Sequence, residues 1–128
     1  MKLDPIYQAE LEEIFKNPRH KGNIVNPSIL ASEQNPLCGD SIRLQLRVEN
    51  GIIQEARFDG SACAVSIIAS EKLLSFIEGK SVAEAKSLTQ DDLLQILGVD
   101  VSMSRIKCAT LVLTALKNAL TSLQEQES

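Results

Sequence analysis

The sequence predicts an α+β domain in which a small antiparallel sheet is covered by helices. One alternating stretch, 41–49, is followed by Asn50-Gly51 and by a second apolar stretch, 52–58, and this arrangement predicts a β-hairpin. Most of the remaining chain repeats its apolar residues at helical spacing. The 128 residues contain no Pro-, Gly- or Ser-rich linker, so we expect one domain spanning residues 1–128.

The N-terminal part of the chain is expected to form an amphipathic helix followed by a loop. Residues 5–16 place four apolar side chains on one helical face, and Asn17-Pro18 ends the pattern. Residues 17–37 contain three prolines with several Asn and Ser, which predicts mostly loop with room for a short strand. The apolar face of the helix consists of Tyr7, Leu11, Ile14 and Phe15.

In the hairpin, alternate residues are expected to face the core, because successive side chains of a strand point to opposite faces. Asn50-Gly51 supplies the positive φ angles of a type I′ turn. The residues expected to point inward are Ile42, Leu44, Leu46 and Val48, and those expected outward are Arg43, Gln45, Arg47 and Glu49.

Helices are expected over most of the C-terminal half. A helix over 63–77 follows the hairpin, two short helices begin after the N-caps Ser81 and Thr89, and a last helix covers about 104–123. Gly79 and Gly98 are expected to follow helix ends. The expected buried positions are Ile67, Ser70, Leu74 and Ile77 in the first helix and Ile106, Ala109, Leu113, Leu116, Leu120 and Leu123 in the last.

The composition argues against nucleic-acid and membrane partners. Aromatic residues make up 3% of the chain and there is no Trp, which leaves few surfaces for base stacking. A formal charge of -4 disfavours a polyanion. No apolar run approaches the roughly 20 residues that span a bilayer, and the acidic N-terminal region does not fit a signal peptide. We therefore expect a cytoplasmic protein with reduced thiols.

Three cysteines and one aspartate form the candidate site. Cys38 lies in a Pro–Gly loop before the hairpin, Cys63 opens the helix after it, and Cys108 falls in the first turn of the predicted last helix. The positive end of a helix favours thiolate at the latter two. Asp40 follows Cys38 through Gly39, so this loop offers a sulfur and an oxygen to one ion. Three thiolates and one carboxylate suit Zn²⁺ or an iron–sulfur cluster.

The sequence also allows each of these residues an ordinary structural role. An isolated cysteine is often a small buried hydrophobe, and Asp40 alone would usually be a turn residue or a cap. Gly39 and Gly60 would then be ordinary turn glycines. No C-x-x-C pair is present, so spacing alone does not define a metal site. His20, the only histidine, is expected at the surface of its loop, and no histidine base stands near a cysteine motif for a hydrolase.

The segments NPLCGDSIRLQL, FDGSACAVSIIAS and RIKCATL contain the three cysteines. Together with the early segment IFKNPRHKG, they resemble the IscU/SufU/NifU N-terminal family of iron–sulfur cluster assembly proteins. The resemblance runs from about residue 6 to residue 120, and all three cysteines fall at the family's expected points. It implies a three-stranded antiparallel sheet covered by helices.

The resemblance also implies roles for the candidate residues. Cys38, Asp40, Cys63 and Cys108 look like the ligands of a transient [2Fe-2S] cluster, of iron or of Zn²⁺, with the aspartate making the cluster labile. Cys108 resembles the thiol that accepts persulfide sulfur from a cysteine desulfurase. The implied function is a scaffold that passes clusters to apo iron–sulfur proteins. We expect a non-enzymatic scaffold, with a sulfur-transferase role left open.

Departures from the family pattern keep a second function open, that of a zinc-dependent sulfurtransferase partner of the SufU type. Lys107 precedes Cys108, as in the SufU branch, where IscU-type members carry His. The LPPVK segment of IscU-type members is missing, since 99–104 reads VDVSMS. Only 44 residues separate Cys63 from Cys108, which favours the scaffold because the SufU insertion is absent. A purely structural zinc domain is the third interpretation, and it predicts unfolding on chelation.

Overall fold

The computed structural model describes residues 5–35, 39–61, 64–98 and 103–127. Within these ranges the chain forms three strands and five helices. They are α1 (Pro5–Lys16), β1 (Ile29–Asn35), β2 (Asp40–Glu49), β3 (Ile52–Asp59), α2 (Ala64–Ile77), α3 (Val82–Lys86), α4 (Gln90–Leu97) and α5 (Met103–Glu127).

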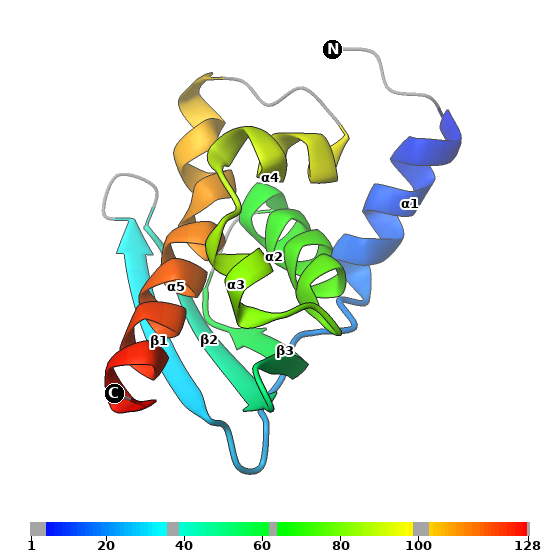
Figure 1. Ribbon diagram of the computed structural model, residues 1–128. Coiled ribbons are helices and arrows are strands. Elements are labelled where there is room, and N and C mark those ends of the chain that lie inside the picture. The colour runs from blue at the N-terminus through cyan, green and yellow to red at the C-terminus, as the bar shows by residue number, and fades with distance from the viewer. Residues whose placement is uncertain (1–4, 36–38, 62–63, 99–102, 128) are drawn as a thin grey trace.

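The three strands form one antiparallel sheet in the order β1-β2-β3. Helices α2, α3, α4 and α5 gather on one face of this sheet, and α1 stands to the side (Figure 1). Helix α5 packs on β1 and β2, and α2 packs on β3 and α5. The predicted α+β class with a three-stranded antiparallel sheet covered by helices is therefore confirmed.

The predicted hairpin is confirmed in both its strands and its turn. Residues Asp40–Glu49 pair with Ile52–Asp59, and Leu44 lies opposite Phe58. Asn50 and Gly51 have φ angles of 55° and 76°, as a type I′ turn requires. The inward positions of the sheet are buried against α2 and α5, with Leu44, Leu46 and Ile53 fully inaccessible to solvent.

One outward position of the hairpin is buried although it faces away from the helices. Gln45 is only 3% exposed, because residues 23–24 cross the open face of the sheet and cover it. Its Oε1 accepts a hydrogen bond from the Ile24 amide at 2.8 Å, and its Nε2 donates to Asn23 Oδ1 at 2.6 Å. The short strand for which the prediction left room in this segment is β1, with seven residues.

The helices follow the predicted caps and stripes closely. Ser81 caps α3 by accepting from the Glu84 amide. Thr89 and Asp92 form both halves of a capping box at α4, which Gly98 ends. The predicted positions of α5 from Ala109 onward are buried where the structure describes them. In α1 the predicted face is only partly covered, because Leu11 is buried whereas Phe15 is 45% exposed. None of the described helices has the length and apolar character needed to cross a bilayer.

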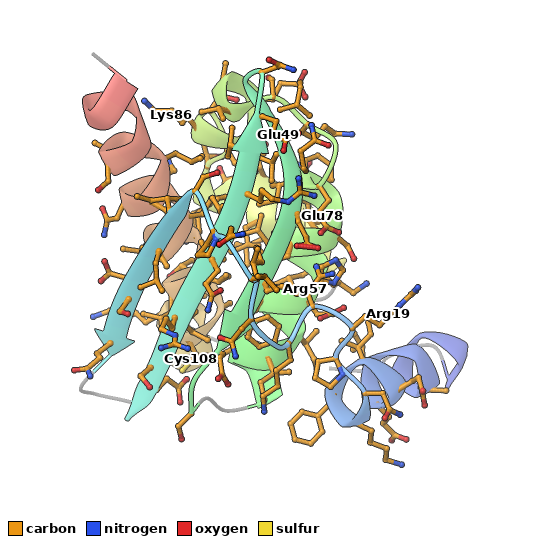
Figure 2. The ribbon with its side chains drawn as sticks, turned by 90° about the horizontal axis from the view of Figure 1, so that it is seen from below. Arg19, Glu49, Arg57, Glu78, Lys86 and Cys108 are labelled. Carbon is orange, nitrogen blue, oxygen red and sulfur yellow. The ribbon has the colours of Figure 1, made fainter. Side chains whose placement is uncertain are left out.

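His20 is buried, so the prediction of a surface histidine was wrong. Its Nδ1 lies 2.6 Å from Glu71 Oε1 and its Nε2 lies 2.7 Å from Glu78 Oε1, both on α2. Ionised carboxylates only accept hydrogen bonds, so both ring nitrogens can donate to them at once only when the ring is an imidazolium, and the two contacts favour this form. Arg57 of β3 also donates to Glu78, at 3.1 Å (Figure 2).

This cluster ties the segment after α1 to the helical layer. The main-chain amides of Arg19 and His20 donate to Glu71 at 3.0 and 2.9 Å, and the Phe58 amide of β3 donates to the carbonyl of His20 at 2.9 Å. The hydrogen bond to Glu71 raises the pKa of His20 above its ordinary 6.5; burial opposes this rise, and Glu78 adds to it. Burial also acts to raise the pKa of both glutamates, but their hydrogen bonds outweigh it and lower both below 4.5.

Replacing His20 with Gln is expected to destabilise the protein by about 1–3 kcal/mol, because the buried carboxylate of Glu71 and the partly exposed carboxylate of Glu78 lose a charged donor. A raised folded-state pKa means that the histidine's contribution is present below pH 6.5 and is lost as the pH rises through the folded value. The lowered pKa values of Glu71 and Glu78 mean that their contribution is present above pH 4.5 and is lost below it. Urea unfolding should therefore show the largest difference between wild type and H20Q between pH 4.5 and 6.5.

Lys21→Gln is the matched control, because it removes an exposed positive charge from the same segment. Its effect on the free energy of unfolding is expected to stay constant as the pH rises above 6.5, whereas the effect of H20Q shrinks. An H20Q difference that is flat across this pH range would contradict the imidazolium assignment.

Candidate functional site

A buried serine joins two of the predicted ligand residues. Asp40 is the first residue of β2 and is 6% exposed, and Ser66 lies in the first turn of α2 and is 1% exposed. The Ser66 hydroxyl donates to Asp40 Oδ2 at 2.6 Å, and its oxygen lies 2.9 Å from the main-chain carbonyl oxygen of Cys108 in α5. Three segments far apart in the sequence therefore meet at one polar junction, which we call the Asp40–Ser66–Cys108 junction.

Cys108 is fully buried, at the end of the sheet where β2 begins (Figure 2). It was predicted in the first turn of the last helix, but α5 begins at Met103, so Cys108 belongs to the second turn. The argument that a helix N-terminus favours its thiolate therefore no longer applies, because that effect is confined to the first turn. The sequence also offers Ser102 and Ser104 as N-caps for this helix; Ser104 lies inside α5, and Ser102 lies outside the described residues.

The segments next to the other two cysteines also lie beside each other. The Ser41 amide donates to the carbonyl of Ser61 at 2.7 Å, so the start of β2 contacts the segment that follows β3. Gly60 has a φ of +131°, and a Cβ built on it would lie 2.2 Å from the Ser41 carbonyl oxygen. This close approach requires glycine, so Gly60 is more than an ordinary turn residue.

The structure describes two of the four predicted ligand residues. The Asp40 carboxylate and the main-chain carbonyl of Cys108 both contact Ser66, whereas Cys38 and Cys63 lie outside the described residues. Among the residues that are described, no three His, Cys, Asp or Glu side chains are grouped closely enough to hold a metal ion. The four-residue ligand set stays a prediction.

Ser66 was missed by the sequence reasoning, although a signal for it exists. It lies four residues before Ser70, which had been placed on the buried stripe of this helix, and residues four apart share a helical face. Ser70 is fully buried and donates to the Ser66 carbonyl oxygen at 2.7 Å. A buried serine needs a hydrogen-bond partner, so its presence on this stripe indicates a polar contact inside the core.

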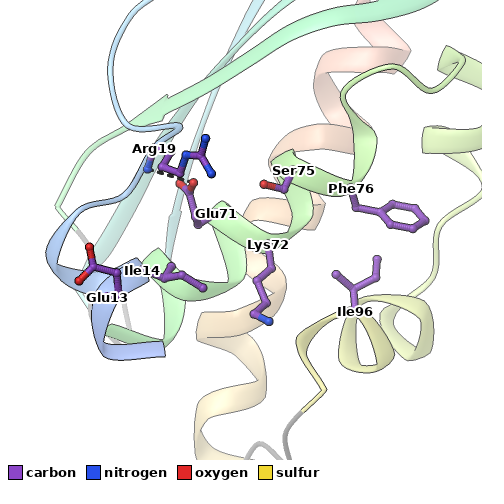
Figure 3. A pocket seen from close by; sticks show the side chains of 8 residues that line it. All are labelled: Glu13, Ile14, Arg19, Glu71, Lys72, Ser75, Phe76 and Ile96. Atoms are coloured by element: carbon purple, nitrogen blue, oxygen red, sulfur yellow. Dashed lines mark hydrogen bonds between the residues drawn. The ribbon is translucent and has the colours of Figure 1, made fainter. Parts of the chain in front are cut away.

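A separate groove of about 590 Å³ lies between α1, α2 and α4. Figure 3 shows Phe76 of α2 and Ile96 of α4 on one side of it and Ile14 of α1 on the other. Its remaining lining residues are Glu13, Arg19, Glu71, Lys72 and Ser75, and neither Asp40 nor Cys108, the two predicted ligands that the structure describes, is among them. The groove is therefore distinct from the Asp40–Ser66–Cys108 junction.

The fold and the cysteine positions define a class of protein. The model of the family described as the NifU-like N terminal domain matches residues 6–128, so the chain belongs to this family. The chain is 33% identical to the zinc-dependent sulfurtransferase SufU of Bacillus subtilis (strain 168), with 92% of this chain and 91% of that protein covered. It is 28% identical to the iron-sulfur cluster assembly scaffold protein IscU 1 of Archaeoglobus fulgidus, with 90% and 74% covered.

Solved structures agree with the fold. A NifU-like protein (N-terminal) from Brucella abortus superimposes with a TM-score of 0.79 at 17% identity, covering 94% of this chain and 96% of that one. A putative iron-sulfur cluster assembly scaffold protein for the SUF system from Fervidobacterium islandicum AW-1 gives a TM-score of 0.73 at 22% identity, covering 86% and 93%. At these identities the likeness shows the fold alone.

Replacing Gly60 with Ala is expected to lower the free energy of unfolding by at least about 2 kcal/mol, because the new methyl group meets a main-chain carbonyl at an unfavourable φ angle. Gly51→Ala is the control, since Gly51 also has a positive φ but a Cβ there meets nothing within 4 Å. It should cost about 1 kcal/mol. Urea unfolding measures both, and equal costs would contradict the close approach of Gly60 to β2.

Proposed function

We propose that this protein is a scaffold for iron–sulfur cluster assembly that accepts sulfur from a cysteine desulfurase and transfers a [2Fe-2S] cluster to apo-proteins. The observation that carries the proposal is the Asp40–Ser66–Cys108 junction, because it brings a buried carboxylate and a cysteine-bearing helix together. Membership of the NifU-like N-terminal family and the names of the IscU and SufU relatives support it.

The proposed ligands of the cluster are Cys38, Asp40, Cys63 and Cys108. In the sequence, Cys38 is two residues from Asp40 and Cys63 is three residues from Ser66, so each is a close chain neighbour of the junction. Thiolates are the common ligands of iron–sulfur clusters and of Zn²⁺, and a carboxylate oxygen is an accepted Zn²⁺ ligand. The donor set therefore fits both an iron–sulfur cluster and Zn²⁺.

The carboxylate suits a site that must release what it binds. An oxygen of Asp40 holds an iron less firmly than a fourth thiolate, since sulfur is the preferred donor for these clusters.

The thiolate ligands must stay reduced, so we propose that the protein works in the cytoplasm, where thiols are kept reduced. We also propose that residues 1–128 act as one domain.

Cys108 is the proposed sulfur acceptor. Its thiolate attacks the outer sulfur of a persulfide on the desulfurase, a new S–S bond forms at Cys108, and the desulfurase cysteine leaves as a thiolate. No net oxidation is needed, because one S–S bond replaces another. Since Cys108 is fully buried in the structure, this step requires the end of the molecule around it to open.

A zinc-dependent sulfurtransferase function is the second candidate. The similarity to the SufU protein of Bacillus subtilis, at 33% identity, favours it. Lys107, which precedes Cys108 and is exposed on α5, resembles the SufU branch as well. In this case Zn²⁺ holds the thiolates until sulfur reaches Cys108, and no cluster is built.

One reconstitution separates the two functions. The purified protein is analysed for Zn and Fe and then incubated anaerobically with Fe²⁺, cysteine, a cysteine desulfurase and a thiol reductant, which reduces the persulfide sulfur to sulfide. We expect a visible sulfur-to-iron charge-transfer spectrum, transfer of the cluster to an apo-ferredoxin, and loss of persulfide formation in Cys108→Ser. Tightly held Zn with faster desulfurase turnover and no cluster would contradict the scaffold and support the sulfurtransferase.

Replacing Asp40 with Cys is expected to slow cluster transfer to the apo-ferredoxin roughly tenfold, equal to about 1.4 kcal/mol in the barrier. A fourth thiolate holds the cluster more firmly than a carboxylate does, so the loaded protein should release it slowly. Asp91→Cys is the control, because it adds a thiol at an exposed position of α4. Absorption spectroscopy measures the rate of cluster transfer. Equal rates for D40C and wild type would argue against Asp40 as the ligand that makes the cluster labile.

A further inference from the structure

The Ser66 hydroxyl is a buried polar group that contacts two other elements of the fold. It is 1% exposed, and its oxygen lies within hydrogen-bond distance of two acceptors, one on β2 and one on α5. A hydroxyl has a single hydrogen, and a charged carboxylate is a stronger acceptor than a main-chain carbonyl. The shorter contact, 2.6 Å to Asp40 Oδ2, is therefore the main hydrogen bond.

A hydrogen bond to one oxygen restricts how the whole carboxylate can rotate. Asp40 begins a strand, where its main chain is fixed by pairing with β1, and Ser66 fixes its side chain from α2. Removing a residue that hydrogen-bonds to a metal ligand, and so holds that ligand in place, commonly lowers metal affinity by about 10–100-fold.

The second contact links the same hydroxyl to α5. The Cys108 carbonyl oxygen, 2.9 Å away, belongs to the helical turn that carries the proposed sulfur acceptor. A change at Ser66 therefore acts on the spacing between β2 and α5 as well as on the orientation of Asp40.

We propose that Ser66 is a positioning residue that orients the carboxylate of Asp40 toward the bound metal. This inference rests on the proposed function, in which Asp40 is a ligand. Ser66 itself contacts no metal, and it acts through its hydrogen bond to Asp40.

Ser66→Ala removes the hydroxyl and leaves the shape of the helix almost unchanged. Ser70→Ala is a closely matched control, because Ser70 is also buried in α2 but its hydroxyl bonds only to a main-chain carbonyl one turn away. Ser66→Thr keeps the hydroxyl and tests for rescue. Asp40→Ala and the double variant D40A/S66A complete a thermodynamic cycle.

The probes are Zn²⁺ and Co²⁺, whose affinities are measured by competition with a chromophoric chelator. The Co²⁺ absorption bands report the geometry of the ligands, and urea unfolding of the metal-free variants reports the purely structural cost. S66A is expected to weaken Zn²⁺ binding roughly tenfold and to shift the Co²⁺ bands, with S66T close to wild type. S70A should stay within about twofold of wild type.

The double variant D40A/S66A tests whether Ser66 acts through Asp40. If Ser66 acts through Asp40, then S66A has no further effect on affinity in the D40A background. An undiminished effect there, or an S66A variant that is destabilised without any change in affinity or spectrum, would overturn the positioning role while leaving Asp40 as a ligand. If D40A itself binds both metals like wild type, the proposed ligand set fails as well.

Discussion

The hydrogen bonds of the Asp40–Ser66–Cys108 junction are the constraint on which the rest of the account depends. They bring the start of β2, the start of α2 and the second turn of α5 together in the core. All three residues are buried, and the Ser66 hydroxyl gives the Asp40 carboxylate a hydrogen bond inside the core. In the sequence, Cys38 lies two residues from Asp40 and Cys63 lies three residues from Ser66, so the proposed ligand set depends on the geometry of this contact.

The remaining structure supplies a rigid frame for this end of the molecule. The apolar face of the hairpin is covered by α2 and α5, and its other face is partly covered by the segment around Asn23. The imidazolium of His20, held between Glu71 and Glu78, fixes that segment to α2. Side chains on the ends of well-packed elements are held more precisely than side chains on loops.

The features predicted from the sequence are those that depend on local patterns. Alternation and an Asn-Gly pair are enough for the hairpin, and Thr89 as an N-cap is enough for the start of α4. Gln45, His20 and Ser66 are different, because each is buried by a partner from a distant part of the chain. A loop histidine is normally a surface residue, and only the approach of two glutamates on α2 makes this one part of the core. Single-sequence patterns do not show which distant residues approach Gln45 and His20. For Ser66 the helical spacing to Ser70 indicates burial, but it does not indicate Asp40 as the partner.

The most direct test of the central claim is X-ray absorption at the zinc edge of the Zn²⁺-loaded protein. If the three cysteines and Asp40 converge on one ion, the first shell contains three sulfur atoms at about 2.3 Å and one oxygen at about 2.0–2.2 Å. A first shell of only nitrogen and oxygen, or one with fewer than three sulfur atoms, would show that these residues do not share a metal and would contradict the account.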